Sequence, residues 1–178
     1  MAALCVYCSS SVTIDPSYVG LATAVGERLA AGGHSLVSGG GRVSMMGAVA
    51  RAARSGGART VGVIPAQLVS IEVADADADE LIVVETMRER KRVMDVRSDA
   101  FLALPGGIGT LEELFETWTS LSLDMHGKPV AVLDPDGFYE PLWTWLDALI
   151  ARGFVRRAAL DQLHRTRTLD EAFAVLRL

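Results

Sequence analysis

A glycine-rich turn followed by two adjacent glutamates is the part of this sequence whose residue types and spacing best suit chemistry. The run from Leu104 to Glu113 reads Leu-Pro-Gly-Gly-Ile-Gly-Thr-Leu-Glu-Glu and has the pattern of a strand end, a glycine loop and a helix start. Free backbone N–H groups, the Thr110 hydroxyl and the positive end of the helix dipole suit a phosphate there. The lysine of a Walker A loop is absent, which argues against a nucleoside triphosphatase.

Glu112 and Glu113 are predicted to lie in the first turn of that helix. A carboxylate is favoured there by the helix dipole, so ordinary helix design is one interpretation. The other is that one carboxylate faces the sugar of a bound nucleotide. Cleavage at an anomeric carbon passes through an oxocarbenium-like state, which a carboxylate stabilises while it orients or deprotonates the attacking water. Neighbouring helical residues point about 100° apart, so the two glutamates are expected to do different work.

A basic helix is predicted over residues 86–97 and supplies the complementary charges. Arg90 can donate a fork of hydrogen bonds to a phosphate or a carboxylate, and Lys91 adds a point charge. The same segment carries Arg88 and Glu89 among other charged residues that could pair along the helix. A solvated helix face therefore remains the alternative to a ligand-binding role.

The second glycine turn, Ser38–Gly47, contains Gly40 and Gly41 and is predicted to face a ligand because it links a strand to a helix. It does not match the dinucleotide-binding fingerprint well, since it follows the second strand and Ser44 stands where the last glycine would be. A purely structural role for this turn remains the alternative interpretation.

The elements that must position these residues alternate along the chain as short apolar runs and amphipathic stretches. This pattern predicts an α/β fold with a parallel sheet covered by helices on both faces. The predicted strands are Ala3–Tyr7, Ser35–Ser38, Thr60–Ile64, Leu81–Val84, Ala100–Leu104 and Val130–Leu133.

The predicted helices fill the gaps between those strands. Asp15 and Pro16 are expected to start the first helix and Ser44 to cap the second, whereas 67–80 is expected to be a surface loop. Thr110 is expected to begin the acidic helix, and residues 169–178 to form the last one.

Length, net charge and composition limit the classes of protein to which this chain can belong. The 178 residues suit a single domain spanning 1–178, and a net charge of −5 offers no general basic field for nucleic acid or an anionic membrane. No apolar run reaches transmembrane length, and the start lacks a signal-peptide pattern, so a cytoplasmic location is expected. Cys5 and Cys8 would lie in or at the end of a strand without a second pair for zinc, which favours structural cysteines and no metal site.

Two motifs together carry a resemblance. Met87-Arg88-Glu89-Arg90-Lys91 followed by Pro105-Gly106-Gly107-Ile108-Gly109-Thr110-Leu111-Glu112-Glu113 resembles the paired M-x-x-R-K and P-G-G-x-G-T-x-x-E motifs of the Lonely Guy (LOG) family. The pairing is more specific than either half. The resemblance implies a Rossmann-like doubly wound fold, a homodimer with sites near the subunit interface, and cofactor-independent hydrolysis of N6-modified adenosine monophosphates to free base and ribose 5-phosphate.

By matching position, the resemblance also implies roles for particular residues. Arg90 and Glu113 would be the catalytic pair, with Glu113 supporting the ribosyl cation and water. The implied ligand contacts are Lys91, Gly106, Gly107, Gly109, Thr110, Glu112, Glu72 and Thr119, to which the turn residues Gly40 and Gly41 are added. The sequence departs from the family at Ser9, Ser44, Arg88 and Ile108, which are positions at the pocket edge and in the glycine turns.

Two other readings remain. A nucleosidase for unmodified AMP would use the same phosphate loop and carboxylate with a different base pocket. A binding module such as a molybdenum-cofactor carrier has a similar fold, and fold alone does not determine function. The family's former label, lysine decarboxylase, finds no support here, since no lysine stands out as an anchor for pyridoxal phosphate.

Overall fold

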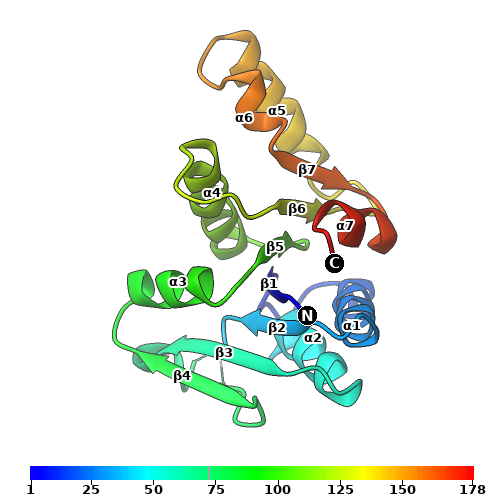
Figure 1. Ribbon diagram of the computed structural model, residues 1–178, viewed down its shortest axis with the longest axis vertical. Coiled ribbons are helices and arrows are strands. Elements are labelled where there is room, and N and C mark those ends of the chain that lie inside the picture. The colour runs from blue at the N-terminus through cyan, green and yellow to red at the C-terminus, as the bar shows by residue number, and fades with distance from the viewer. Residues whose placement is uncertain (72) are drawn as a thin grey trace.

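The computed structural model describes residues 1–71 and 73–178, and in this part of the chain one parallel sheet of seven strands forms the centre of the molecule (Figure 1). The strand order is β4-β3-β2-β1-β5-β6-β7. The strands are β1 (Ala3–Tyr7), β2 (Ser35–Ser38), β3 (Thr60–Pro65), β4 (Glu80–Val84), β5 (Ala100–Ala103), β6 (Val130–Leu133) and β7 (Leu163–Thr166).

Helices connect successive strands, as parallel pairing requires. They are α1 (Pro16–Ala31), α2 (Ser44–Ser55), the short 3-10 helix η1 (Ala66–Leu68), α3 (Met87–Val96), α4 (Ile108–Ser122), α5 (Glu140–Ala151), α6 (Arg157–Leu160) and α7 (Leu169–Val175). The predicted α/β class and the doubly wound parallel sheet are confirmed.

Each face of the sheet has its own apolar core because side chains alternate along a strand. Leu4 and Val6 of β1 pack with residues of α1, α2 and α7, whereas Cys5 and Tyr7 pack with residues of α3, α4 and α5. In Figure 1, α1, α2 and α7 accordingly lie on one side of the strands and α3 and α4 on the other. The sheet is thus buried on both faces.

The strand order reverses between β1 and β5. From β1 the chain moves outward to β4 and then returns to add β5 on the other side of β1, where Tyr7 pairs with Ala103. The connections that leave these two neighbouring strands therefore diverge from the same edge of the sheet. Such a switch point is where open α/β sheets bind ligands.

The predicted strands agree with the structure to within one residue at each end, but the edge strand β7 was not predicted. The start of α1 is also confirmed, since Asp15 accepts a hydrogen bond from the Ser17 N–H at 2.8 Å. The capping role expected of Ser44 is wrong. Val43 occupies the N-cap position of α2, and the Ser44 hydroxyl donates instead to the carbonyl of Ser11 at 2.5 Å.

Helix α4 begins two residues earlier than expected. Gly107 takes the N-cap position, and its carbonyl accepts from the Leu111 N–H at 3.0 Å, so the first turn already contains Ile108 to Thr110. The prediction that Glu112 and Glu113 lie in the first turn is therefore wrong: they lie in the second. The helix dipole acts on them more weakly than on first-turn residues.

The segment 67–80 is not the simple surface loop expected. It begins within η1, and its last residue starts β4. Asp75 is only 4% exposed, because its carboxylate forms an ion pair with Arg54 of α2. Among the described residues, no helix is both long and apolar enough to cross a membrane.

Candidate active site

A cavity of about 300 Å³ opens at the carboxyl edge of the sheet, beside the switch point between β1 and β5. Its walls come from the turn after β1, the turn after β5 with the start of α4, and the starts of α2 and α3, with one residue of η1. The lining residues are Cys8, Ser9, Ser10, Ser11, Met46, Leu68, Met87, Arg90, Gly107, Ile108, Gly109, Thr110, Glu112 and Glu113. The cavity thus brings together both predicted catalytic residues and most of the predicted phosphate loop.

Arg90 is almost fully buried, with 4% of its surface exposed, and its guanidinium is held by backbone. Nε donates to the carbonyl of Val63 in β3 at 3.1 Å, and Nη2 donates to the carbonyl of Gly39 at 2.8 Å. Thr86 caps α3 by accepting from the Glu89 N–H at 3.1 Å, which fixes the helix that carries Arg90. A planar donor group with two carbonyl partners has little freedom to turn.

Gly39 makes this arrangement possible because it has no side chain. A Cβ at position 39 would lie 2.0 Å from Nη2 of Arg90, far inside van der Waals contact. The turn after β2 therefore binds the Arg90 guanidinium through a backbone carbonyl. The sequence pattern pointed to a ligand-facing turn and gave no sign of this contact, which joins residues 51 positions apart.

The loop after β5 has the geometry of an anion site. Gly107 and Gly109 have open space where a side chain would project, so nothing blocks the backbone there. A Cβ at Gly106 would meet Oγ1 of Thr110 at 2.1 Å, which means that the glycine lets the Thr110 side chain pack against the loop. The N–H groups of the first turn of α4 have no intrahelical acceptor and lie at the positive end of the dipole.

Tyr139 stabilises the loop after β5 through a hydrogen bond to the residue before it. Its hydroxyl donates to the carbonyl of Leu104 at 2.8 Å, directly before the loop, and its N–H donates to the carboxylate of Asp134 at 3.1 Å. Burial raises the pKa of Tyr139 well above its ordinary value, so the phenol remains a donor. Tyr139 was not among the predicted site residues.

Glu113 lies one helical turn after Thr110 on α4, and side chains with this spacing share a helix face. It lines the main cavity and also a second one of about 200 Å³, to which α3 contributes Arg88 and Arg92. Burial raises the pKa of the Cys8 thiol, and the nearby negative charge of Glu113 raises it further. Cys8 is therefore a neutral wall residue of the cavity.

Glu112 takes part in an ion-pair cluster between α3 and α4. Lys91 donates to the carboxylates of both Glu112 and Glu116. Burial alone would lower the pKa of Lys91, but the hydrogen bonds to these carboxylates outweigh it and raise that pKa. Lys91 lines the second cavity and not the first, so the two predicted cationic residues of α3 occupy different surroundings.

Three of the remaining predicted contacts, Gly40, Gly41 and Thr119, do not line the cavity. Gly40 and Gly41 are buried within the turn after β2, where the carbonyl of Gly40 accepts a hydrogen bond from the N–H of Asp75 at 2.8 Å. Thr119 lines a separate groove between α4 and α5 beside Trp118. Glu72 falls outside the described residues.

Several lining residues were not predicted as site residues, above all the serines that follow β1. Ser9, Ser10 and Ser11 reach the cavity because β1 and β5 are neighbours, so the turns after these strands open at the same edge. The signal that could have found them is their place at the end of the first strand of a doubly wound sheet. In the described part of the chain, no group of three or more His, Cys, Asp or Glu side chains is arranged to hold a metal ion.

Comparison with known proteins gives one family. A family model described as possible lysine decarboxylase matches residues 46–176. The cytokinin riboside 5′-monophosphate phosphoribohydrolase of Mycobacterium marinum is 53% identical over 167 residues, which are 94% of this chain and 89% of that protein. The enzyme of the same name from Mycobacterium tuberculosis is 52% identical over 158 residues, 89% of this chain and 84% of that protein.

Among solved structures, the molybdenum cofactor binding protein from Rippkaea orientalis is similar with a TM-score of 0.71 and 20% sequence identity. The match covers 98% of this chain and 93% of that one. At this identity the likeness concerns the fold, and it extends over nearly the whole chain.

Proposed function

Because this chain belongs to the LOG family of phosphoribohydrolases, we propose that it hydrolyses the N-glycosidic bond of an N6-modified adenosine 5′-monophosphate. The products would be the free cytokinin base and ribose 5-phosphate. The observation that carries the proposal is the cavity at the switch point, which unites the helix start of α4 with the side chains of Arg90 and Glu113. Its lining includes donors that suit a phosphate and apolar side chains that suit a base.

The phosphate is proposed to bind at the start of α4. The N–H groups of Ile108, Gly109 and Thr110 point out of the first turn, and the Thr110 hydroxyl adds a further donor. Open space at Gly107 and Gly109 leaves room for the oxygens. A nucleoside without phosphate would lose these contacts, so the site should distinguish monophosphates from nucleosides.

Glu113 is proposed to carry out the hydrolytic step. Its position one turn beyond Thr110 suits a carboxylate that faces the ribose of a nucleotide whose phosphate lies at the helix start. Water would add its oxygen to C1′ while the bond from C1′ to the base nitrogen breaks, and the bonding electrons leave with the base. The carboxylate would stabilise the positive charge on the ribose, accept a proton from the water and pass it to the nitrogen of the leaving base, so that the base is released neutral and the carboxylate is ionised again.

Arg90 is proposed to fix Glu113 and the ligand relative to each other. Two backbone carbonyls hold its guanidinium at 2.8 and 3.1 Å, so the charge is fixed before the substrate arrives. Preorganised charge of this kind stabilises a transition state without a reorganisation cost.

The base is proposed to lie against the apolar part of the cavity. Met46, Leu68, Met87 and Ile108 contribute to its walls, and Ile108 is 89% exposed at the rim. An apolar group on N6 of adenine would cover such side chains, which supports a modified adenine over adenine itself.

A homodimer is part of the proposal. Apolar side chains exposed near the cavity, Ile108 and Met87 among them, support a partner close to the site. A mass near twice 19.0 kDa in light scattering would agree with this assembly, and a monomer at micromolar concentration would contradict it.

The experiment that tests the function is chromatographic detection of free base. Wild-type protein is incubated with isopentenyladenosine monophosphate, with AMP and with the two corresponding nucleosides. Release from the modified monophosphate, with little from the nucleosides, is the expected result. Faster release from AMP would identify a general nucleosidase, and binding of a phosphorylated pterin without any release would identify a carrier.

A further inference from the structure

The segment that connects η1 to β4 is fastened to the turn that holds Arg90. The Asp75 N–H donates to the carbonyl of Gly40 at 2.8 Å, and the Arg42 N–H donates to the carbonyl of Val73 at 3.0 Å. Between these two bonds, Gly41 and Ala74 pair as an antiparallel bridge. Residues 73–75 thus run beside the turn as a short strand-like strap.

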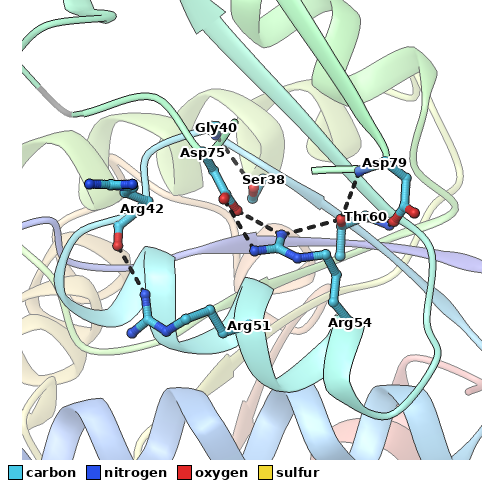
Figure 2. A network of polar contacts seen from close by, with 8 residues as sticks. All are labelled: Ser38, Gly40, Arg42, Arg51, Arg54, Thr60, Asp75 and Asp79. Carbon is cyan, nitrogen blue, oxygen red and sulfur yellow. Dashed lines mark hydrogen bonds and ion pairs between the residues drawn. The ribbon is translucent and has the colours of Figure 1, made fainter. Parts of the chain in front are cut away.

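One buried ion pair holds this strap to the body of the protein. The Arg54 guanidinium binds the Asp75 carboxylate with both of its terminal nitrogens, at 2.7 and 3.1 Å. The side chain of Arg54 is 17% exposed and that of Asp75 only 5%. Figure 2 shows the Arg54 guanidinium between Asp75 and Thr60 of β3, to whose hydroxyl it also donates at 3.4 Å.

A second carboxylate closes the same network. Asp79 accepts from the Thr60 N–H at 2.8 Å and from the Thr60 hydroxyl at 3.0 Å (Figure 2). Because Arg54 lies in the last turn of α2, these contacts join that helix, β3 and both ends of the segment 75–79. The strap therefore has a defined position relative to the sheet.

We propose that the Arg54–Asp75 ion pair positions the catalytic arginine: it holds residues 73–75 against the Gly39–Arg42 turn and so fixes the Gly39 carbonyl that binds Arg90. The inference rests on the proposed function, in which Arg90 acts at the substrate. Neither Arg54 nor Asp75 lines the cavity. They act on the reaction through the backbone of the turn.

The type of interaction supports a positioning role. A buried ion pair adds little net stability compared with an apolar replacement, since both charges lose their hydration. A bidentate arginine–carboxylate pair fixes the orientation of the two side chains, because both hydrogen bonds must be aligned at once. The site needs such precision, since a shift of about 1 Å in a catalytic group can lower a rate about a hundredfold.

The test uses Asp75→Asn, which preserves shape but removes the charge and one of the two acceptors. Glu80→Gln is the control, because Glu80 also accepts from two arginines, Arg59 and Arg97, neither of which belongs to the turn or to the strap. We expect Asp75→Asn to lower kcat by about tenfold to a hundredfold, with KM changed less than about threefold. The Glu80→Gln variant should keep both constants near wild type.

Hydrogen exchange followed by mass spectrometry gives a second readout that needs no turnover. Peptides covering 39–42 and 73–75 should exchange faster in Asp75→Asn than in wild type, and peptides from α5 should not change. Retention of wild-type kcat by Asp75→Asn, or unchanged exchange in both segments, would overturn the inference. If the wild-type protein released no base, the proposed function would fail, and the exchange measurement would still decide whether the ion pair holds the turn.

The test must distinguish a positioning role from a general loss of stability, so it includes a variant that is only less stable. Val25→Ala removes buried methyl groups from α1, a helix that contains no residue of the turn or of the strap, and serves as a variant with lowered stability and an intact ion pair. If Val25→Ala and Asp75→Asn lowered kcat equally at matched folded fraction, the ion pair would be structural only. Partial recovery of kcat in Asp75→Glu, which restores the charge, is expected from a positioning role.

Discussion

The carbonyl oxygen of Gly39 lies 2.8 Å from Nη2 of Arg90, and the same glycine has no room for a side chain because a Cβ would lie 2.0 Å from that nitrogen. A turn after β2 and a helix after β4 thus meet at one buried guanidinium. The proposed chemistry depends on this contact, since it sets where the positive charge stands in the cavity.

Replacing Gly39 should disturb the reaction more than the fold. Gly39→Ala must displace the guanidinium, so we expect kcat to fall about a hundredfold. Gly20→Ala is the control, because nothing lies within 4 Å of a Cβ there, and alanine within a helix adds about 0.5–1 kcal/mol to the free energy of unfolding. Steady-state kinetics and urea unfolding of both variants check the prediction, and wild-type kcat in Gly39→Ala would refute it.

Removing the Tyr139 hydroxyl should loosen the phosphate loop. Tyr139→Phe leaves the Leu104 carbonyl without this donor, which should cost about 1–3 kcal/mol of stability and raise KM for the monophosphate. Tyr18→Phe is a suitable comparison, because that hydroxyl donates to Asp136 at the surface. Thermal unfolding and KM are the measurements. Equal values for the two variants would show that the buried hydrogen bond does not support the loop.

Lys91 is expected to affect binding of the monophosphate because it neutralises two carboxylates. Lys91→Met leaves Glu112 and Glu116 unneutralised beside the cavity, so binding of a dianionic monophosphate should weaken about tenfold. The effect should shrink as salt screens the carboxylates. Lys128→Met removes a comparable pair, with Asp95 at 2.8 Å, and should leave KM unchanged. KM at low and high ionic strength distinguishes the two variants.

The buried thiols should make the protein less stable in alkali. Burial raises the pKa of Cys5 and Cys8 in the folded state, whereas an unfolded thiol ionises near 9.0. Above that pH the unfolded state binds fewer protons than the folded state, so the free energy of unfolding falls as pH rises. At a pH of about 10 each thiol should cost about 1 kcal/mol.

Urea unfolding under reducing conditions, at pH values of about 8 and about 10, measures this loss. Cys8→Ala should show a smaller decrease between the two pH values than wild type, because one of the two thiols is gone. The decrease in the free energy of unfolding is taken between the two pH values for each protein separately. The constant destabilisation from the cavity left by Cys8→Ala therefore cancels. The same decrease in both proteins would mean that Cys8 does not contribute.

Six of the seven strands of the sheet were predicted from the sequence, since they are short apolar runs that recur between amphipathic segments. The sequence did not reveal β7, where Leu163–Thr166 includes His164 and Arg165, because an edge strand is buried less and needs no continuous apolar run. The start of α4 was placed too late because glycines lower helix propensity, whereas here Gly107 serves as the N-cap.

The candidate site was predictable where its residues are neighbours in sequence. The loop from Gly106 to Thr110 and the motif around Arg90 could be recognised from their residue types. The strap of residues 73–75 and its ion pair with Arg54 could not be predicted, because this segment of alanines and aspartates lacks the large apolar residues that indicate burial. Long-range pairs of this kind follow from topology and become visible only in the folded chain.

The central claim, that Glu113 carries out the hydrolytic step, is tested most directly by comparing base release in Glu113→Gln and Glu112→Gln. Both substitutions preserve shape and remove one charge from adjacent residues of α4. We predict that Glu113→Gln lowers kcat on isopentenyladenosine monophosphate by about a thousandfold or more while the monophosphate still binds, and that Glu112→Gln mainly raises KM. Wild-type kcat in Glu113→Gln would contradict the account.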